Sequence, residues 1–342
     1  MFSYQEDRDV FVVAEVSANH GHDIQVVKNS ILKAKEIGCN AVKIQTYTPD
    51  TITLKSDKEW FQVNNGTIWD GTTLYDLYSE AMLPWEWHED LFAFAREIGM
   101  TLFSSPFDET AIDLLESCGN PIYKIASFEI TDIPLIKRAA STHKPVIIST
   151  GIATLDEIED AVQACRSVGN DDVCLLKCTS QYPAKIEDAN VQTMVDMRER
   201  FHTAVGLSDH TMGSTVPVVA TSLGAQVIEK HFTLDRGIGG PDASFSMEPD
   251  EFKDMIDQVR LAKTAVGAVT YELSEKKLAS RKYARSLFVV EDVRKGERVT
   301  RENVRSIRPS AGMSPAEFDF IVGCKFAVDV ERGTPMSKDL LE

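Results

Sequence analysis

The sequence predicts an α/β fold in which a closed (β/α)8 barrel is followed by a small β-rich domain. Short apolar runs of strand length alternate with helix-like segments eight times before Gly267, and eight such units favour a closed barrel over an open sheet. The chain has 342 residues, whereas a barrel of this kind takes about 250. The remainder suffices for one small extra domain, and a hydrophobic content of 43% supports a full core.

The strands are predicted from apolar runs that end in polar or glycine positions, as in the buried strands of parallel sheets. They are Asp9–Ser17, Ala41–Gln45, Thr101–Phe103, Ile122–Ile125, Pro145–Ser149, Val173–Lys177, Thr203–Leu207 and Gln226–Ile228. The helices are predicted from apolar residues at helical spacing and from end signals, such as Asp23 as an N-cap and Pro249 at a first helical position. They run from Asp23 to Gly38, over Trp85–Ile98, Glu109–Ser117, Asp132–Ala140, Leu155–Val168, Ala189–Arg200 and Thr215–Leu223, and from Pro249 to Gly267.

Two stretches depart from this alternation. Thr46–Leu83 has no strong periodicity, and loops of this length in compact domains are usually lids or binding loops. After the barrel at 1–267 and a polar linker at 268–284, the segment 292–300 is echoed by the segment 329–337, both with an Asp-Val start and a glycine turn. The repeat predicts a pseudo-symmetric domain over 285–342, which is small enough to need a surface to dock on.

The composition excludes several classes of function. A formal net charge of −17 repels nucleic acid and anionic membranes, so an anionic substrate needs a local basic pocket. No apolar run reaches transmembrane length, and Met1–Val10 is too polar for a signal peptide. The six cysteines are scattered without a Cys-x-x-Cys motif, so we expect reduced thiols in a cytoplasmic protein.

Two histidines stand at equivalent positions after the last two predicted barrel strands. His210 ends the run Ser208-Asp209-His210, and His231 ends Glu229-Lys230-His231. The carboxyl ends of barrel strands are where catalytic groups are kept. Two imidazoles on neighbouring strand ends are suited to share one divalent metal. The alternative is that each is a hydrogen-bonded histidine of the core or rim, and the residues alone leave both interpretations open.

Charged residues near other strand ends indicate a polar pocket. Lys43 and Lys124 lie among many serines and threonines, a set that suits a ligand with phosphate and carboxylate groups. The alternative for each lysine is an apolar stem with its head in water. Glu15, inside an apolar run, either pairs with a basic residue or handles protons near a reacting carbonyl. Asp242 is either a turn aspartate or a group that overhangs the histidines.

Several short motifs, taken in order, resemble those of the sialic acid synthase family. They are Glu15 with Asn19-His20, Lys43-Ile44-Gln45-Thr46, Tyr123-Lys124-Ile125-Ala126-Ser127, Gly206-Leu207-Ser208-Asp209-His210 and Glu229-Lys230-His231-Phe232. The C-terminal part, with Lys295-Gly296 and Ile307-Arg308-Pro309, is similar to the antifreeze-like (SAF) domain of that family. The resemblance covers essentially the whole chain, and the order and spacing of the motifs make it specific.

The resemblance implies a reaction, a metal and a set of site residues. The reaction is condensation of phosphoenolpyruvate with an open-chain acetamido sugar, with release of phosphate. The metal is divalent, usually manganese with magnesium or cobalt as alternatives, and lies at His210 and His231. The positions that hold phosphoenolpyruvate are Lys43, Ser105, Lys124, Ser127, Ser180 and Ser208, and those near the sugar or reacting centre are Glu15, Gln45, Tyr182 and Asp242. We expect Glu15, Lys43, Lys124 and Asp242 to be the catalytic groups among these.

The resemblance also implies a partner subunit and a subgroup. Arg308 matches an arginine that the SAF domain inserts into a partner's barrel, which implies a domain-swapped homodimer. Residues 43–50 and 69–78 look most like the pseudaminic acid synthases, whose sugar is 2,4-diacetamido-2,4,6-trideoxy-L-altrose. The alternatives are an N-acetylneuraminate or legionaminate synthase with the same chemistry, a metal-free Schiff-base aldolase or lyase using Lys124 or Lys43, and a non-catalytic binding module.

Overall fold

The computed structural model describes residues 9–64, 66 and 69–342, which form two compact units divided between residues 267 and 268. Residues 1–8, on which the expectation of no signal peptide mostly rests, lie outside this description. Within the described part of the chain, no helix is both long and apolar enough to span a membrane. All six cysteines are free thiols, and five of them are buried.

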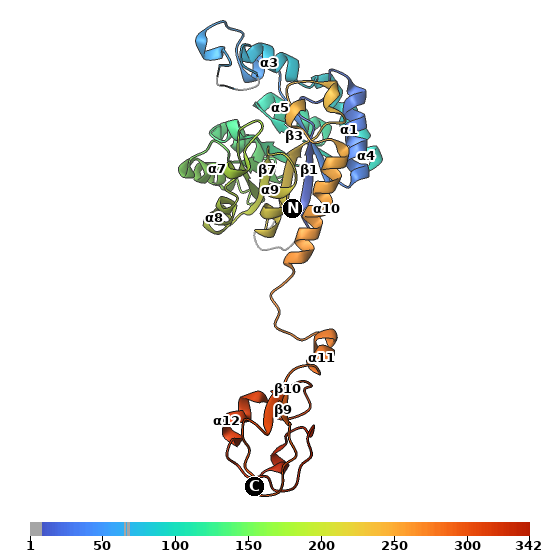
Figure 1. Ribbon diagram of the computed structural model, residues 1–342. Helices are drawn as coiled ribbons and strands as arrows, with labels where there is room; N and C mark the ends of the chain where they lie inside the picture. The colour runs from blue at the N-terminus through green and yellow to red at the C-terminus, as the bar shows by residue number, and fades with distance from the viewer. Residues whose placement is uncertain (1–8, 65, 67–68) are drawn as a thin grey trace. The chain divides into compact units, whose positions relative to one another are not determined.

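The first unit is a closed barrel of eight parallel strands surrounded by helices, which confirms the predicted TIM-barrel fold (Figure 1). The strands are β1 (Phe11–Glu15), β2 (Ala41–Thr46), β3 (Thr101–Pro106), β4 (Tyr123–Ile125), β5 (Val146–Ser149), β6 (Val173–Cys178), β7 (Ala204–Asp209) and β8 (Val227–His231). The helices that follow them are α1 (Ile24–Ile37), α4 (His88–Ile98), α5 (Glu109–Cys118), α6 (Ile133–Ala140), α7 (Leu155–Ser167), α8 (Gln192–Phe201), α9 (Thr215–Ser222) and α10 (Pro249–Val266). β1 pairs with β8, which closes the barrel.

The helix ends follow from local chemistry that the sequence already carries. Asp23 caps α1 by accepting a hydrogen bond from the backbone N–H of Gln25, at 2.8 Å. Gly38 ends the same helix with a φ of 96°, a left-handed conformation that suits a residue without a side chain. Pro249 occupies the first turn of α10, where its missing N–H costs nothing.

The strand residues alternate between two apolar layers. Odd-numbered β1 and β2 residues such as Val13 and Ala41 pack inside the barrel with Phe103 and Ile147, whereas Val12 and Val42 pack outward in the cluster that includes helix residues. The apolar inner layer fills only the half of the barrel nearest the amino ends of the strands. Toward the carboxyl ends the inward positions become polar, and this change creates the site.

The long segment between β2 and α4 contains structure that the sequence did not predict. It holds α2 (Pro49–Ile52), the short 3₁₀ helix Glu59–Phe61 and α3 (Leu74–Ala81). These helices have three to eight residues, which is shorter than the window of about 11 residues in which helical periodicity can be recognised.

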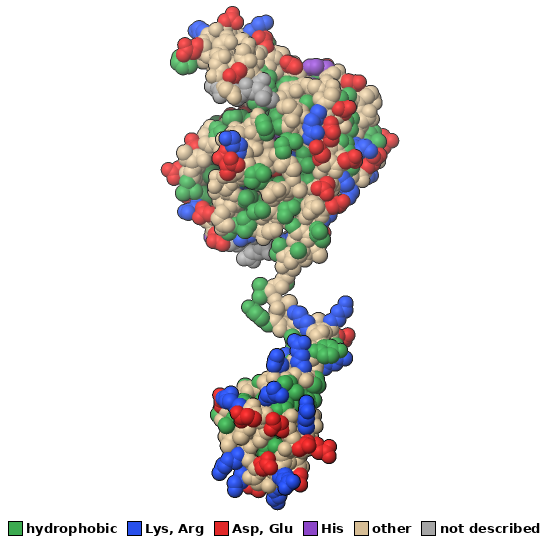
Figure 2. All heavy atoms as spheres, viewed as in Figure 1, with side chains coloured by type: hydrophobic (Ala, Val, Ile, Leu, Met, Phe, Trp, Pro, Cys, Tyr) green, Lys and Arg blue, Asp and Glu red, His purple; other side chains and the backbone are tan. Residues whose placement is uncertain are grey.

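The second unit contains α11 (Glu275–Arg281), β9 (Ser286–Val289), β10 (Val304–Ile307) and α12 (Phe318–Ile321), and Figure 2 shows Lys and Arg side chains spread over it among Asp and Glu. The sequence repeat pairs with itself here. Val293 and Val330 exchange two backbone hydrogen bonds of 2.9 and 2.8 Å. Asp329 accepts from the N–H of Lys295 at 2.7 Å, and Asp292 accepts from that of Arg332 at 2.8 Å. This reciprocal pairing explains why the two segments look alike.

Candidate active site

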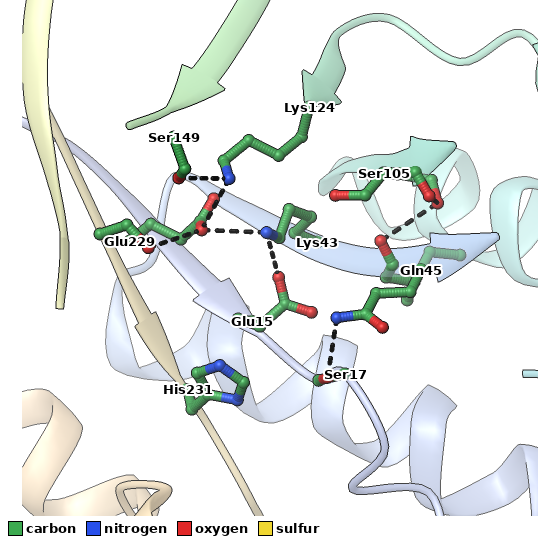
Figure 3. A network of polar contacts seen from close by, with 12 residues as sticks. Glu15, Ser17, Lys43, Gln45, Ser105, Lys124, Ser149, Glu229 and His231 are labelled. Carbon is green, nitrogen blue, oxygen red and sulfur yellow. Dashed lines mark hydrogen bonds and ion pairs between the residues drawn. The ribbon is translucent and has the colours of Figure 1, made fainter. Parts of the chain in front are cut away.

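A cluster of buried charges lies at the carboxyl ends of β1, β2, β4 and β8. Lys43 Nζ is 2.5 Å from Glu15 Oε2 and 2.9 Å from Glu229 Oε1, so it lies between the two carboxylates (Figure 3). Lys124 Nζ is 3.5 Å from the same Glu229 oxygen and donates to Ser149 Oγ at 2.7 Å. The side chains of the four charged residues are at most 5% exposed. The mouth of the barrel therefore contains two lysines, each held by buried ion pairs or hydrogen bonds. Positive groups of this kind are what an anion site requires.

The charges in this cluster depend on one another. Burial by itself raises the pKa of Glu229, but Lys124 and Lys43 outweigh it and hold that pKa at about 2. Burial lowers the pKa of Lys43 to about 7, against the opposing attraction of Glu229. Glu229 therefore stays ionised, and one of its oxygens attracts the ammonium groups of both lysines. Because Glu15 Oε1 has no hydrogen-bond partner among the described residues, this carboxylate keeps an acceptor for a ligand or water.

Serine hydroxyls form a second cluster beside the lysines. Ser180 Oγ donates to Ser127 Oγ at 3.0 Å, and the backbone N–H of Ile152 donates to Ser127 Oγ at 3.1 Å. A Cβ placed on Gly151 would collide with Ser180 Oγ and lie 2.8 Å from Ser127 Oγ, so only glycine leaves this hollow open. Ser105 Oγ is buried and has no partner within the described part of the chain. Hydroxyls and a backbone N–H in this arrangement suit a carboxylate or phosphate group.

Other predicted polar residues also reach this region. Ser208 Oγ donates to Glu229 Oε1 at 3.2 Å, which joins β7 to the charge cluster. Gln45 Nε2 donates to Ser17 Oγ at 2.9 Å and so turns its amide toward the end of β1 (Figure 3). The structure thus brings together predicted site residues from β1, β2, β3, β4 and β7 and from the turns that follow β4 and β6.

The two histidines lie side by side. The ring centroids of His210 and His231 are 5.2 Å apart. His210 Nδ1 makes a 2.9 Å hydrogen bond to the carbonyl oxygen of Thr179, which directs its other nitrogen away from the backbone. His231 Nδ1 is buried without a hydrogen-bond partner among the described residues. Burial, with help from His210 and nearby lysines, lowers the pKa of His231 well below its usual value, so this imidazole is neutral and can act as a ligand.

His231 fits a divalent metal by its chemistry. A neutral, buried and unpartnered ring nitrogen is the donor that borderline metals prefer. His210 lies beside it, and its pKa is raised because interactions with Cys178 and Thr179 outweigh the effect of burial. Among the residues that the structure describes, no group of three or more His, Cys, Asp or Glu side chains is arranged to hold an ion. A metal held by His210 and His231 would have further coordination positions for water or substrate.

Loop residues close the site on the side of the histidines. Asp242 Oδ2 is 3.8 Å from His231 Nδ1 and accepts a 3.4 Å hydrogen bond from the N–H of Ala18. Burial raises the pKa of Asp242 above its ordinary value. The ring centroid of Tyr182 is 4.4 Å from that of His210. Arg308 belongs to the second unit, where it is exposed, and the structure does not place it relative to the barrel.

Three polar residues of this site were assigned no role from the sequence. Glu229 and Ser149 stand near predicted strand ends, and their inward positions follow from strand alternation. Glu129 lies in the 3₁₀ turn Ser127–Glu129 after β4, where no periodicity applies. Its Oε2 is buried without a partner among the described residues, and burial raises its pKa to about 7 against the influence of Lys124. These features suit a group that exchanges protons near neutral pH.

An α/β barrel with paired lysines, a hydroxyl hollow and two adjacent imidazoles at its strand ends has the architecture of a barrel enzyme that acts on an anionic substrate. The chain belongs to the NeuB family, whose model matches residues 30–271, and the SAF domain model matches residues 284–342. The resemblance to the sialic acid synthase family is thereby confirmed. Enzymes of this family generally use a divalent metal.

Individual relatives are similar over nearly the full length. The chain is 47% identical to pseudaminic acid synthase of Helicobacter pylori over 97% of each chain. It is 37% identical to N,N'-diacetyllegionaminic acid synthase of Legionella pneumophila over 97% of this chain and 94% of that protein. A solved structure, the N-acetylneuraminic acid synthetase of Leptospira borgpetersenii in complex with citrate, superposes with a TM-score of 0.71 at 29% identity and covers 80% of this chain and 90% of that chain.

Proposed function

We propose that this chain condenses phosphoenolpyruvate with 2,4-diacetamido-2,4,6-trideoxy-L-altrose to give pseudaminic acid and inorganic phosphate. The observation that carries the proposal is the 47% identity to the Helicobacter pylori pseudaminic acid synthase over 97% of both chains. The charge cluster, the serine cluster with Ser127 and Ser180, and the histidine pair supply groups for each part of that reaction. Phosphoenolpyruvate and buried, reduced cysteines both suit the cytoplasm, which we propose as its location.

The reaction balances with one molecule of water. Carbon 3 of phosphoenolpyruvate forms a bond to the aldehyde carbon of the open-chain sugar, and the aldehyde oxygen takes up a proton. The oxygen of water adds to carbon 2, and the bond from carbon 2 to the phosphate oxygen breaks. Phosphate leaves, and the product has a ketone at carbon 2, either free or in the cyclic form of the sugar acid.

Each step has a group of this chain beside it. We assign the phosphate to Lys43 and Lys124, whose charges oppose the negative charge of the leaving group. The carboxylate is assigned to the hydroxyls of Ser127, Ser180 and Ser208, with Ser105 on the phosphate side. Glu15 Oε1, which has no hydrogen-bond partner among the described residues, is suited to orient the attacking water.

The sugar end is assigned to the opposite side of the site. Tyr182 and Asp242 lie beside the histidines, and these two residues together with Gln45, which is hydrogen-bonded to Ser17, would hold its polar groups. His210 and His231 would hold the metal, for which Mn²⁺ is our first choice, and a bound metal supplies Lewis acidity to the aldehyde oxygen. Asp242, with its raised pKa, is placed to pass a proton to that oxygen.

The experiment compares sugars in one assay. Release of phosphate and formation of the nine-carbon acid would be measured with the diacetamido-trideoxy-altrose, N-acetylmannosamine and a diacetamido-mannose analogue. We expect the first sugar to be preferred by at least about 10-fold in kcat/KM, since single groups are discriminated to about that degree. Preference for either of the other two would replace the proposal with an N-acetylneuraminate or legionaminate synthase.

One observation favours the Schiff-base alternative enough to test it. The lowered pKa of Lys43 provides a fraction of neutral amine near neutral pH. Borohydride reduction in the presence of pyruvate would trap an adduct on Lys43 or Lys124 in such an enzyme. We expect no adduct, because both lysines are held by ion pairs to Glu229.

We also propose that two chains complete each other's sites. Phe128, Ile152, Ile186 and Met212 are exposed by 60, 49, 53 and 44% and follow β4, β5, β6 and β7. They place apolar side chains on four successive loops at the carboxyl ends of the strands. In the second unit, Arg308 has no ion pair among the described residues and is free to reach an anionic site. The proposed dimer covers the loops of one barrel with the second unit of the partner.

A further inference from the structure

Three aromatic side chains from three separate loops form one cluster beside the histidines. Trp69, Tyr182 and Phe245 come from the segments after β2, β6 and β8. Their ring centroids are 5.4 Å apart for Trp69 and Tyr182, 5.3 Å for Tyr182 and Phe245, and 6.5 Å for Trp69 and Phe245. We call these three residues the aromatic wall. No part of the reaction described above uses Trp69 or Phe245.

The wall touches both imidazoles. Tyr182 is 4.4 Å from His210, and Phe245 is 5.0 Å from His231, measured between ring centroids. Phe245 is only 3% exposed and is the most buried of the three residues. Trp69 and Tyr182 are each partly exposed. The result is an apolar surface on the sugar side of an otherwise charged site.

Trp69 is held in this position from the opposite loop. Its indole N–H donates to the carbonyl oxygen of Pro241 at 3.0 Å. Pro241 precedes Asp242, whose carboxylate is 3.8 Å from His231. The long segment after β2 is thereby tied to the loop after β8, and the tryptophan ring is fixed relative to the histidine pair.

The chemistry of the wall fits one feature of the proposed sugar. Two acetamido methyl groups and a 6-methyl group make this sugar more apolar than N-acetylmannosamine, which has hydroxyls at positions 4 and 6. Aromatic faces bury methyl and C–H groups favourably, whereas a hydroxyl that loses water there without a partner is destabilised. We propose that Trp69 is a specificity-determining residue, which packs against the methyl-bearing groups of the sugar and selects against hydroxylated analogues. This inference rests on the proposed function.

The test is a change in preference rather than in activity alone. Trp69→Ala and Trp69→Phe would be compared with the wild type by measuring kcat/KM for the diacetamido-trideoxy-altrose and for N-acetylmannosamine, and the KM for phosphoenolpyruvate. In Trp69→Ala we expect kcat/KM for the first sugar to fall about 10- to 100-fold and the preference between sugars to shrink by a similar factor. The KM for phosphoenolpyruvate should change less than about twofold, because the lysine and serine clusters contain no part of the wall.

Two variants serve as controls. Trp69→Phe keeps an aromatic face but loses the hydrogen bond to Pro241, so we expect an intermediate preference. Trp60→Ala removes the tryptophan of the 3₁₀ turn Glu59–Phe61 in the same long segment, where it is 78% exposed. It should leave the preference and both KM values unchanged. Far-ultraviolet circular dichroism and thermal melts would check that each variant folds.

The outcomes separate this inference from the proposed function. If wild type does not prefer the diacetamido sugar, the proposed function fails. If wild type prefers it and Trp69→Ala loses activity equally with both sugars, or mainly raises the KM for phosphoenolpyruvate, the role of Trp69 is overturned and the function stands. Should Trp69→Ala not fold, an unchanged preference in folded Trp69→Phe would overturn the inference as well.

Discussion

Glu229 is the residue on which the charges of the site depend. One of its oxygens lies 2.9 Å from Lys43 and 3.5 Å from Lys124, and it also accepts from Ser208. Two ammonium groups this close would repel each other without a shared counterion. Glu229 therefore offsets part of this repulsion before a ligand arrives.

We predict that Glu229→Gln weakens both stability and activity. Removal of one partner from a buried ion pair typically lowers the free energy of unfolding by about 3 kcal/mol. Activity should fall at least about 100-fold, because one lysine then loses its proton and no longer opposes the phosphate charge. Chemical denaturation and phosphate release would measure the two effects. Asp113→Asn, which breaks the exposed pair with Arg138, should cost less than about 1 kcal/mol and leave activity unchanged. Equal effects of the two variants would contradict the role of Glu229.

Glu129 leads to a prediction about pH. Burial raises its pKa from 4.5 to about 7. Between these pH values the folded protein keeps a proton that the unfolded chain has released, so this group lowers the stability of the fold as the pH rises through that window. We expect the Tm of Glu129→Gln relative to wild type to increase from pH 4.5 to pH 7.5 and then to level off. Glu36→Gln, at an exposed position of α1, should show a constant difference. A constant difference for Glu129→Gln as well would show that this carboxyl is not perturbed.

At the scale of elements, an ion pair on the outer side of the sheet joins β7 and β8, the two strands at whose carboxyl ends the histidines lie. Asp209 of β7 and Lys230 of β8 are register partners, and their charged atoms are 2.5 Å apart. Both side chains are at most 2% exposed. Lys230 also donates to the carbonyl oxygen of Thr211. Since strand side chains alternate, this pair faces outward while His210 and His231, the next residue in each case, face the site.

We predict that this pair holds the strand ends in register. Lys230→Met leaves Asp209 buried without its counterion and should lower the free energy of unfolding by about 3 kcal/mol. The double change Asp209→Leu with Lys230→Met removes both charges and should recover most of that loss. Denaturant unfolding would measure both, with Lys253→Met on the exposed face of α10 as a control that changes little. A double variant no more stable than the single one would show that the loss does not come from an uncompensated charge.

At the scale of the whole molecule, the two units belong to one proposed dimeric enzyme. Arg308 lies in the second unit, whereas His210 lies in the barrel. If Arg308 acts in the partner's barrel, Arg308→Ala and His210→Ala disable different parts of a shared site. Each variant alone should have little activity.

We predict that a mixture of these two variants regains activity. Random exchange of subunits gives heterodimers in half of the molecules, and each has one site with both groups intact, so about a quarter of the wild-type activity should return. Phosphate release after mixing and brief partial unfolding would measure it. Mixing either variant with more of itself is the control. No recovery, in a mixture shown by mass spectrometry to contain heterodimers, would place Arg308 in its own chain's site or in none.

Much of the fold and part of the site follow from local patterns. Apolar runs of strand length and the end signals Asp23, Gly38 and Pro249 predicted the barrel because each acts within a few residues. The likeness of 292–300 to 329–337 predicted the small domain in the same way, and the structure shows in addition that the two segments pair. The helices of the long segment between β2 and α4 were not predicted, because they are too short for helical periodicity to be recognised.

The sequence by itself determined which side chains point into the barrel, because strand periodicity is a local property of the backbone. Only the tertiary structure decided which of those side chains meet. Glu229 contacts Lys43 and Lys124 from strands 186 and 105 residues away, at distances set by barrel closure and strand tilt. Trp69 reaches Pro241 through loops whose conformation depends on the packed barrel beneath them. Contacts of this kind are long-range in the chain, and no local pattern encodes them.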